Sequence, residues 1–208
     1  MKISKINQKN FDRLVEEMVK AIKNGRVIVC PTDTVYGLIA DAANKKAIGK
    51  IFKIKKRPKN KHIPIFVKDL KMARKLAEIS KKQEKFLKSA WPGKVTAVLK
   101  RTLPRPSGFG GQAKTKIRLY GVAKETIALR IPKYELLFKL AKQLNRPLAG
   151  TSANIFGKSA STKIKEILQQ FQNQKHQPDL IVDAGNLKLS KPSTVIDLTQ
   201  GKPKILRK

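Results

Sequence analysis

The sequence has 208 residues, of which 40% are hydrophobic, and no apolar run approaches the roughly 20 residues that a transmembrane helix needs. We expect one domain over residues 1–208, with no additional C-terminal domain, because this length suits a single core. The first residues contain no secretory signal, and the single cysteine, Cys30, excludes an internal disulfide and a multi-cysteine metal cage. A cytoplasmic location is therefore expected. Cys30 lies in an apolar run, which favours a small buried hydrophobe over a nucleophile.

The charge is extreme, since 47 Lys and Arg residues against 14 Asp and Glu residues give a formal net charge of +33. Such a balance predicts salt-dependent attraction to polyanions such as tRNA, rRNA or nucleotide phosphates. Many of the lysines, however, are scattered along expected helices, where they would form solvated faces. The composition indicates that the protein associates readily with nucleic acid, but it does not identify nucleic acid as the substrate.

The first half of the chain alternates between helical and extended patterns. Apolar residues at helical spacing predict a helix over 11–22, which ends before Gly25. There follow, in chain order, a strand over 27–32, a helix over 47–57 that Pro58 ends, a strand over 63–68, a helical region over 69–90 in two pieces around Ser80, and a strand over 95–101.

The second half begins with segment 102–124, which is rich in Pro, Gly and basic residues and which we expect to be a mobile loop and a candidate lid. After it we expect, in order, a strand over 126–132, a helix over 134–145, a strand over 147–152, a helix over 162–172 and strands over 180–185, 193–198 and 204–208. Alternation that gives way to a group of strands predicts an α/β fold with a mixed sheet.

Polar side chains follow the first expected strand directly. Thr32, Asp33, Thr34 and Tyr36 place hydroxyl and carboxyl groups at a strand end, where α/β sheets bind ligands. We predict a binding site at this point.

Two further segments carry groups that suit anions. Lys55 and Arg57 precede Pro58 and could make an anion site if they face the hydroxyl-rich strand end, or could serve only as cations at a helix C-terminus. Ser152 and Asn154, in the segment 150–162, are two residues apart, so an extended backbone would point both the same way. Their segment suits phosphate or ribose binding, and it also suits a plain loop with helix caps.

Other signals are weaker or missing. The stretch 108–115 resembles a phosphate-binding loop, but its flanks are not a strand and a helix, so a flexible basic loop is the simpler interpretation. The two histidines, His62 and His176, lie near no other ligand type, so we predict no metal site, no catalytic triad and no carboxylate pair for hydrolysis. Scarce acids and bases beside plentiful anion donors suit a reaction done by positioning and charge stabilisation, as in nucleotidyl transfer.

Several of these segments together resemble the YrdC-like family of threonylcarbamoyl-AMP synthases. The matching stretches, in the family's order, are PTDTVYGL, the Lys-x-Arg of KIKKRPK, WPGKVTAVL, TIALRIP, TSANIFGKSAS and the pair STVIDL and ILR. The likeness runs from about residue 10 to the last residue, and agreement at several separate segments makes it stronger than any single motif.

The resemblance implies a YrdC-like twisted, open, mixed β-sheet flanked by helices, with a concave and positively charged cleft. It also implies a nucleotidyltransferase that makes threonylcarbamoyl-AMP and pyrophosphate from L-threonine, bicarbonate or CO2, and ATP, with Mg²⁺ expected only as the companion of ATP. Partner enzymes would then transfer the threonylcarbamoyl group to the adenosine beside the anticodon of tRNAs that read ANN codons. An affinity for tRNA or double-stranded RNA is expected. A membrane partner is not expected.

Site residues are implied by the same matches, one motif position at a time. Lys55 and Arg57 are the implied catalytic pair, which would hold the threonine carboxylate and the ATP phosphates. The implied threonine contacts are Thr34, Arg130, Thr151 and Ser193. The implied nucleotide contacts are Arg57, Lys61, Thr126, Ser152, Ala153, Asn154, Ser161 and Arg207.

The sequence departs from the family at two positions and leaves other functions open. His62 stands where many relatives have proline, and Phe66 where some longer members have histidine, so a differently lined threonine pocket is expected. The main alternative is a non-catalytic protein that binds double-stranded RNA or rRNA in the same cleft, although RNA backbone binding has no need of small hydroxyl and amide groups. A carbamoyl-transfer module of hydrogenase maturation shares the fold, but its accessory zinc-finger and acylphosphatase segments do not occur here.

Overall fold

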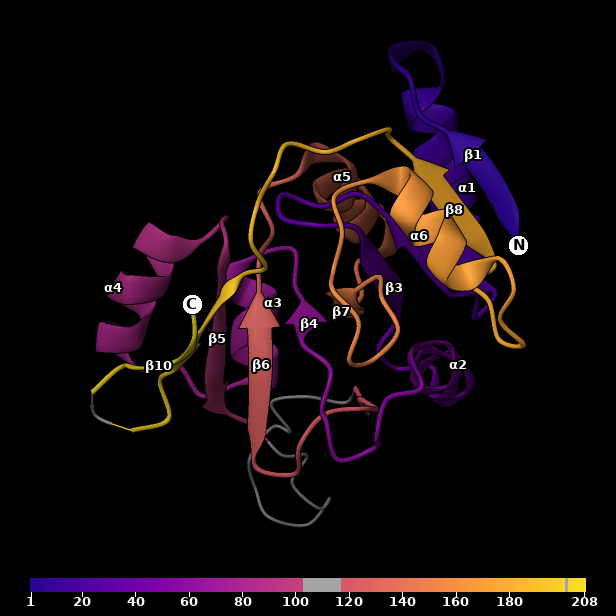
Figure 1. Ribbon diagram of the computed structural model, residues 1–208. Coiled ribbons are helices and arrows are strands. Elements are labelled where there is room, and N and C mark those ends of the chain that lie inside the picture. The colour runs from indigo at the N-terminus through magenta and orange to yellow at the C-terminus, as the bar shows by residue number, and fades with distance from the viewer. Residues whose placement is uncertain (103–116, 201) are drawn as a thin grey trace.

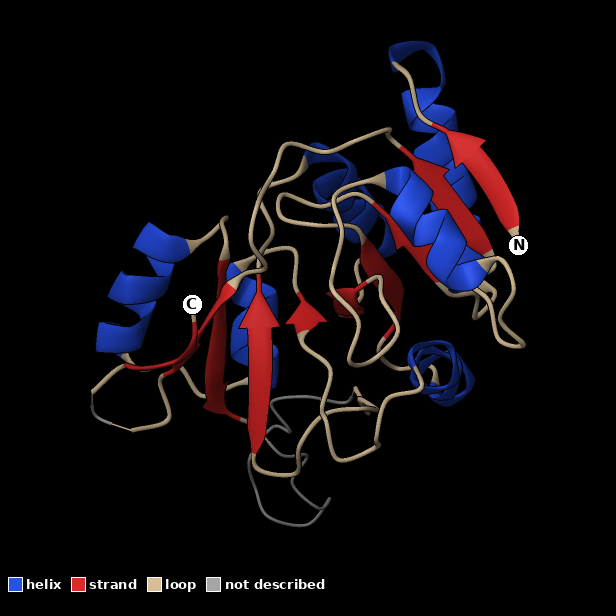
Figure 2. Ribbon diagram, viewed as in Figure 1, coloured by secondary structure: helices blue, strands red, loops and turns tan. Residues whose placement is uncertain are grey.

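The computed structural model describes residues 1–102, 117–200 and 202–208. Its centre is a ten-stranded mixed sheet with the order β1-β8-β2-β3-β7-β4-β6-β5-β9-β10 (Figures 1 and 2). The strands are β1 (Lys2–Lys5), β2 (Ile28–Cys30), β3 (Gly37–Asp41), β4 (Ile65–Phe66), β5 (Val95–Lys100), β6 (Thr126–Arg130), β7 (Leu148–Ser152), β8 (Leu180–Asp183), β9 (Thr194–Asp197) and β10 (Lys204–Arg207).

Helices cover both faces of this sheet. They are α1 (Phe11–Lys23), α2 (Lys45–Lys55), α3 (Leu70–Leu76), α4 (Lys81–Ala90), α5 (Glu135–Leu144) and α6 (Ile164–Phe171), and a short 3₁₀ helix over Gln8–Asn10 precedes α1. One apolar cluster joins α1 and α5 to the sheet, and a larger one joins α2, α3, α4 and α6 to it. Two clusters exist because successive side chains of a strand point to opposite faces of the sheet. In β2, Ile28 and Cys30 enter the first cluster while Val29 enters the second.

The end of α2 matters most for the site. The helix is capped at its start by Asn44, whose side chain accepts a hydrogen bond from the Ala47 N–H, and at its end by a left-handed residue, Lys56, with φ of 51°. The Arg57 N–H still bonds the Phe52 carbonyl, and Pro58 follows directly, so the helix does not continue. The side chain of Lys55 bonds to the loop after β7, whereas that of Arg57 bonds to the carbonyls of Lys61 and His62 in the loop after α2.

Most of the predicted elements are confirmed. The helical region 69–90 is divided at Ser80, which caps α4 through a hydrogen bond from the Gln83 N–H. The prediction was wrong in omitting two strands, β1 and β3, and the strand expected over 63–68 is reduced to β4. The stretch 108–115 and most of the candidate lid, 102–124, lie outside the described residues.

The sheet is mixed, as predicted. Antiparallel pairs such as β3–β7 and β5–β6 lie beside parallel pairs such as β4–β6 and β5–β9. Cys30 is fully buried, and this burial raises the pKa of its thiol, which fits the structural interpretation of that residue. Within the described ranges, no helix combines the length and the apolar character that crossing a bilayer would require.

Candidate functional site

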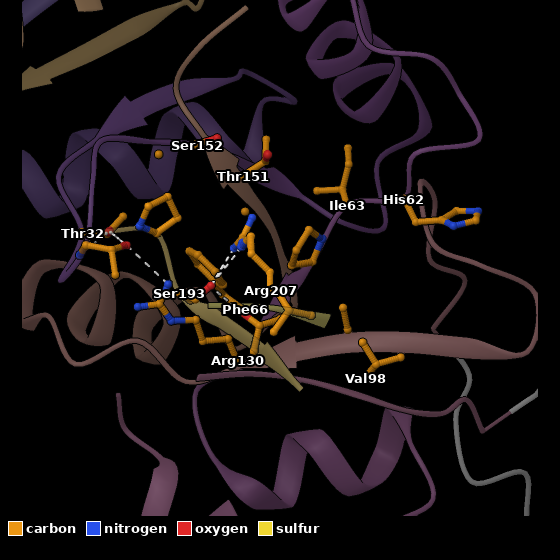
Figure 3. A pocket seen from close by; sticks show the side chains of 18 of the residues that line it. Thr32, His62, Ile63, Phe66, Val98, Arg130, Thr151, Ser152, Ser193 and Arg207 are labelled. Carbon is orange, nitrogen blue, oxygen red and sulfur yellow. Dashed lines mark hydrogen bonds between the residues drawn. The ribbon is translucent and has the colours of Figure 1, made fainter. Parts of the chain in front are cut away.

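A cavity of about 370 Å³ opens on the face of the sheet built by β5, β6, β7 and β9, within the size range of small-molecule sites. Residues of like register face it, because alternate side chains of a strand point to one side: Thr126, Ala128 and Arg130 from β6, and Thr96 and Val98 from β5. Figure 3 shows Thr32 and Arg130 at one end of the cavity and His62 and Val98 at the other.

The turn after β2 supplies hydroxyl groups to the first end. Thr32 Oγ1 and Thr34 Oγ1 share a hydrogen bond of 2.9 Å, and the Thr34 N–H donates to Thr32 Oγ1 at 3.0 Å. Both side chains are buried and both line the cavity. The turn therefore holds Thr34 in place through its neighbour, and a small ligand would meet a fixed hydroxyl group.

Arg130 is the buried cation of this end. Its side chain donates from Nη2 to Asp33 Oδ1 at 2.6 Å, from Nε to the Gly93 carbonyl at 3.0 Å, and from Nη1 to Thr34 Oγ1 at 3.5 Å. Burial lowers the pKa of the guanidinium, and the Asp33 carboxylate opposes that shift. Since a guanidinium has about five N–H donors, Arg130 keeps donors free for a ligand carboxylate.

Ser193, directly before β9, and Arg207, in β10, close the same region. Ser193 Oγ shares a hydrogen bond of 2.8 Å with Thr96 Oγ1, and Arg207 donates from Nη2 to the Ser193 carbonyl at 2.7 Å. Figure 3 shows the Arg207 side chain reaching into the middle of the cavity from this anchor. The Ser193 carbonyl thus holds the Arg207 guanidinium beside the buried Ser193 hydroxyl.

Arg57 enters the cavity beside His62. Its Nε donates to the Lys61 carbonyl at 2.7 Å and its Nη2 to the His62 carbonyl at 2.8 Å, so the loop that follows α2 fixes the direction of the guanidinium. Burial, and then repulsion from Arg207, lowers the pKa of Arg57. Arg57 and Arg207 are therefore close enough for their charges to interact. Two neighbouring cations suit a polyphosphate.

Lys55 lies behind the residues that line the cavity and is not one of them. Its Nζ is buried and donates to the Ser152 carbonyl at 2.6 Å, the Asn154 carbonyl at 2.7 Å and Asn154 Oδ1 at 3.1 Å. Burial, with repulsion from Arg57, lowers its pKa to about 7. The three donors of the ammonium are all directed at the loop after β7, so in this structure Lys55 positions that loop and does not face the cavity.

The loop after β7 brings the side chains of Ser152 and Asn154 together but does not direct both at the cavity. Ser152 Oγ donates to Asn154 Oδ1 at 2.6 Å. Ser152 lines the cavity, whereas Asn154 turns inward and donates to the carbonyls of Ile155 and Lys158. Ser161 is buried farther along and bonds Glu166 Oε2 at 2.6 Å.

The implied site residues therefore divide into two groups. Those that line the cavity are Thr34, Arg57, Thr126, Arg130, Thr151, Ser152, Ser193 and Arg207. Those that lie outside its described lining are Lys55, Lys61, Ala153, Asn154 and Ser161. Ligand contacts for both groups remain predictions.

Sequence reasoning assigned no role to several lining residues. Thr96 forms the floor under Ser193, and Val98, Ala128 and Val195 add an apolar wall. Strand alternation could have found Val98 and Ala128, because they share a face with Thr96 and Arg130. The described lining includes His62 and Phe66, so both departures from the family pattern lie at the cavity.

A family model that covers Sua5, YciO and YrdC proteins, described as telomere recombination, matches residues 20–208. The chain belongs to this family. Within it, the chain is 34% identical over 202 residues to a relative from Methanocaldococcus jannaschii, which covers 97% of this chain and 88% of that protein. It is also 34% identical over 187 residues to the threonylcarbamoyl-AMP synthase of Pyrococcus abyssi, with 89% of this chain and 51% of that protein covered.

Solved structures of the Sua5/YciO/YrdC family have the same fold. Sua5 of P. abyssi complexed with L-threonine superposes with a TM-score of 0.80 at 30% identity, over 99% of this chain and 56% of that one. Escherichia coli YciO superposes with a TM-score of 0.78 at 28% identity, over 100% of this chain and 93% of that one. The chain thus spans about half of the P. abyssi protein and nearly all of YciO.

Proposed function

We propose that the chain is an L-threonylcarbamoyladenylate synthase, a nucleotidyltransferase that forms threonylcarbamoyl-AMP and pyrophosphate from L-threonine, bicarbonate or CO2, and ATP. The observation that carries the proposal is one cavity in which a hydroxyl-rich end, with Thr34, Arg130 and Ser193, adjoins the guanidinium groups of Arg57 and Arg207. The first end suits a small amino acid and the second suits phosphates. The synthase name of the P. abyssi relative and the threonine in its Sua5 structure support this assignment.

The proposed chemistry requires no protein nucleophile. The neutral threonine amine attacks the carbon of CO2 and releases a proton to solvent, or attacks the carbon of bicarbonate with loss of water, and gives a carbamate. A carbamate oxygen then forms a bond to the α-phosphorus of ATP, while the bond from that phosphorus to the bridging oxygen breaks and pyrophosphate leaves. The protein has to align two anions and offset their repulsion, which cations and fixed hydrogen-bond donors can do.

The residues divide this work by position. Arg130, Thr34, Thr151 and Ser193 are proposed to hold threonine, and Arg57, Thr126, Ser152 and Arg207 to hold the nucleotide. Lys61, Ala153, Asn154 and Ser161 are retained as nucleotide-side residues, and Lys55 as the positioning residue of the loop after β7. Mg²⁺ is proposed to enter as the ATP complex, as part of the substrate.

The product is proposed to pass to partner enzymes that place the threonylcarbamoyl group on the adenosine beside the anticodon of tRNAs reading ANN codons. The net charge of +33 favours contact with tRNA during this transfer, and it also favours the second candidate function, binding of double-stranded RNA or rRNA without catalysis. RNA binding alone does not separate these functions, because any protein this basic attracts RNA at low salt.

Release of pyrophosphate from ATP separates them. The wild-type protein is assayed with and without L-threonine and bicarbonate, beside Arg57→Ala and with circular dichroism to verify folding. Release that needs both co-substrates and is lost in Arg57→Ala is the expected result. A folded wild-type protein without threonine-dependent release would overturn the synthase assignment and favour the RNA-binding function.

A further inference from the structure

The three arginines of the cavity differ in one respect, which is their pairing with carboxylates. Arg130 forms an ion pair with Asp33, whose Oδ1 lies 2.6 Å from its Nη2. In the described part of the chain, Arg57 and Arg207 bond to backbone carbonyls and to Ser193 Oγ, and no carboxylate pairs with either. No Asp or Glu is among the described residues that line the cavity.

The Asp33–Arg130 pair is a fixed part of the fold. The two side chains are only 7% and 4% exposed, and the second carboxylate oxygen of Asp33 accepts a hydrogen bond from the Lys133 N–H at 2.9 Å. Asp33 is therefore held on both oxygens behind the cavity wall, while Arg130 lies in the wall. A ligand at this end meets donors of Arg130 whose positive charge is already balanced.

The cavity consequently has two ends of different charge. At the end with Thr34 and Arg130 the carboxylate of Asp33 balances the arginine, whereas Arg57 at the other end has no such partner; the unpaired Arg207 lies between them, bonded to Ser193 (Figure 3). An arginine whose charge a carboxylate balances offers N–H donors to a zwitterion, which brings equal and opposite charges, whereas an unpaired cation favours an anion. Phosphates then have one favourable end in which to bind.

We propose that Asp33 is a specificity-determining residue, which cancels the charge of Arg130 so that this end takes a zwitterionic amino acid in preference to an anion of the same shape. This inference rests on the proposed function, because it assumes that threonine binds at Arg130. Asp33 touches neither substrate in this scheme and acts through Arg130. It is thus separate from the hydroxyl and arginine contacts assigned above.

The discriminating ligand is (R)-3-hydroxybutanoate, which is L-threonine without its ammonium group. Binding of both compounds is measured by titration calorimetry for the wild type and for Asp33→Asn, which keeps the shape and one acceptor oxygen, replaces the second oxygen by an amide NH2 and loses the charge. We expect the wild type to prefer threonine by about ten-fold or more, and the preference to fall by about ten-fold in Asp33→Asn, the range of one charged hydrogen bond.

Asp41→Asn is the matched control. Asp41 also pairs with an arginine, Arg146, at 3.0 Å and accepts from a backbone N–H, that of Ala43, at 2.8 Å, with a side chain 6% exposed. It lies at the far end of β3 from the cavity and does not line it. Both variants lose a buried carboxylate charge, so only an effect at the site separates them.

Each outcome has one meaning. An unchanged preference in folded Asp33→Asn, or an equal fall in Asp41→Asn, would overturn the role of Asp33 and leave the synthase function intact. If Asp33→Asn does not fold, the wild-type titration decides alone, since equal or tighter binding of (R)-3-hydroxybutanoate contradicts the proposed preference for the zwitterion. Failure of the wild type to bind threonine, with no threonine-dependent release of pyrophosphate, would instead refute the proposed function.

Discussion

The ring of Phe66 lies so close to Gly150 of β7 that position 150 has no room for a side chain. A Cβ atom built at Gly150 would lie 2.5 Å from Cε2 of Phe66, well inside van der Waals contact. Phe66 is buried and lines the cavity, and its ring centre is 5.9 Å from the guanidinium carbon of Arg130. The glycine thus allows the ring to lie against the sheet, beside the cation proposed to bind threonine.

Gly150→Ala should therefore damage both stability and the site. The new methyl group must push the Phe66 ring away from β7, and overpacking of this kind costs about 1–3 kcal/mol of unfolding free energy. Urea denaturation measures this loss. Gly49→Ala is the control, because a Cβ at Gly49 in α2 meets nothing within 4 Å and should stabilise the helix by about 0.5–1 kcal/mol. Equal effects of the two substitutions would contradict the role of the close contact.

Lys55 should make stability depend on pH. Its pKa is lowered from 10.5 to about 7 by burial and by repulsion from Arg57, so between these values the unfolded chain holds a proton that the folded one has released. Stability then rises with pH through this window, by up to about 1.4 kcal/mol per pH unit. Urea denaturation from pH 6 to pH 9 should show this slope in the wild type and its loss in Lys55→Met.

Lys53→Met is the matched control for that experiment, because Lys53 is an exposed residue of the same helix. Its slope should follow the wild type. If Lys55→Met retains the slope, another group is responsible for the pH dependence.

Tyr36 should anchor the segment that carries Ser193. Its hydroxyl donates to the Gly185 carbonyl at 2.7 Å and accepts from the Ala184 N–H at 3.0 Å, at the start of the connection from β8 to β9. Tyr36→Phe leaves both backbone groups without that partner and should cost about 1–3 kcal/mol. Thermal denaturation gives the loss, and faster hydrogen exchange at Ala184 locates it. Tyr134→Phe serves as the control, because the Tyr134 hydroxyl has no hydrogen bond to any described residue.

Arg207→Lys should separate charge from geometry. The guanidinium bonds the Ser193 carbonyl through Nε and Nη2, and an ammonium group keeps the charge without this fork. We expect the KM for threonine to rise by about ten-fold, since Ser193 loses its anchor, while the unfolding free energy changes by less than about 1 kcal/mol because Arg207 is exposed. A wild-type KM in this variant would show that charge alone suffices.

The elements that sequence reasoning found are those whose burial pattern is local. Leu14 and Met18 repeat at helical spacing, and α1 buries both. Strand β3 was missed because all five of its residues are buried, so it shows no alternation, and because it follows directly on the polar turn. Strand β1 was missed because it is a short, lysine-rich edge strand, which exists only through pairing with β8, far along the chain.

The site divides in the same way. Thr34 and Arg130 were recoverable, because each stands in a motif at a strand end and the structure brings them together. The orientation of Lys55 was not, since the carbonyls of Ser152 and Asn154 that accept from its ammonium lie 97 and 99 positions away in the chain. Thr96 gains its role from Ser193, a residue 97 positions away, which no local pattern can indicate.

That dependence on distant partners has a kinetic consequence. Gly37 is opposite Ser152 across the β3–β7 pair, and Asp33 and Arg130 are 97 positions apart. Such non-local pairing is slow to form, because long loops must close before any contact is made. No single hairpin or helix supplies a complete binding surface of the cavity. A ligand should therefore bind only after the strands of the sheet have paired. A bound ligand should in turn slow hydrogen exchange in both β3 and β6, because binding stabilises the assembled sheet.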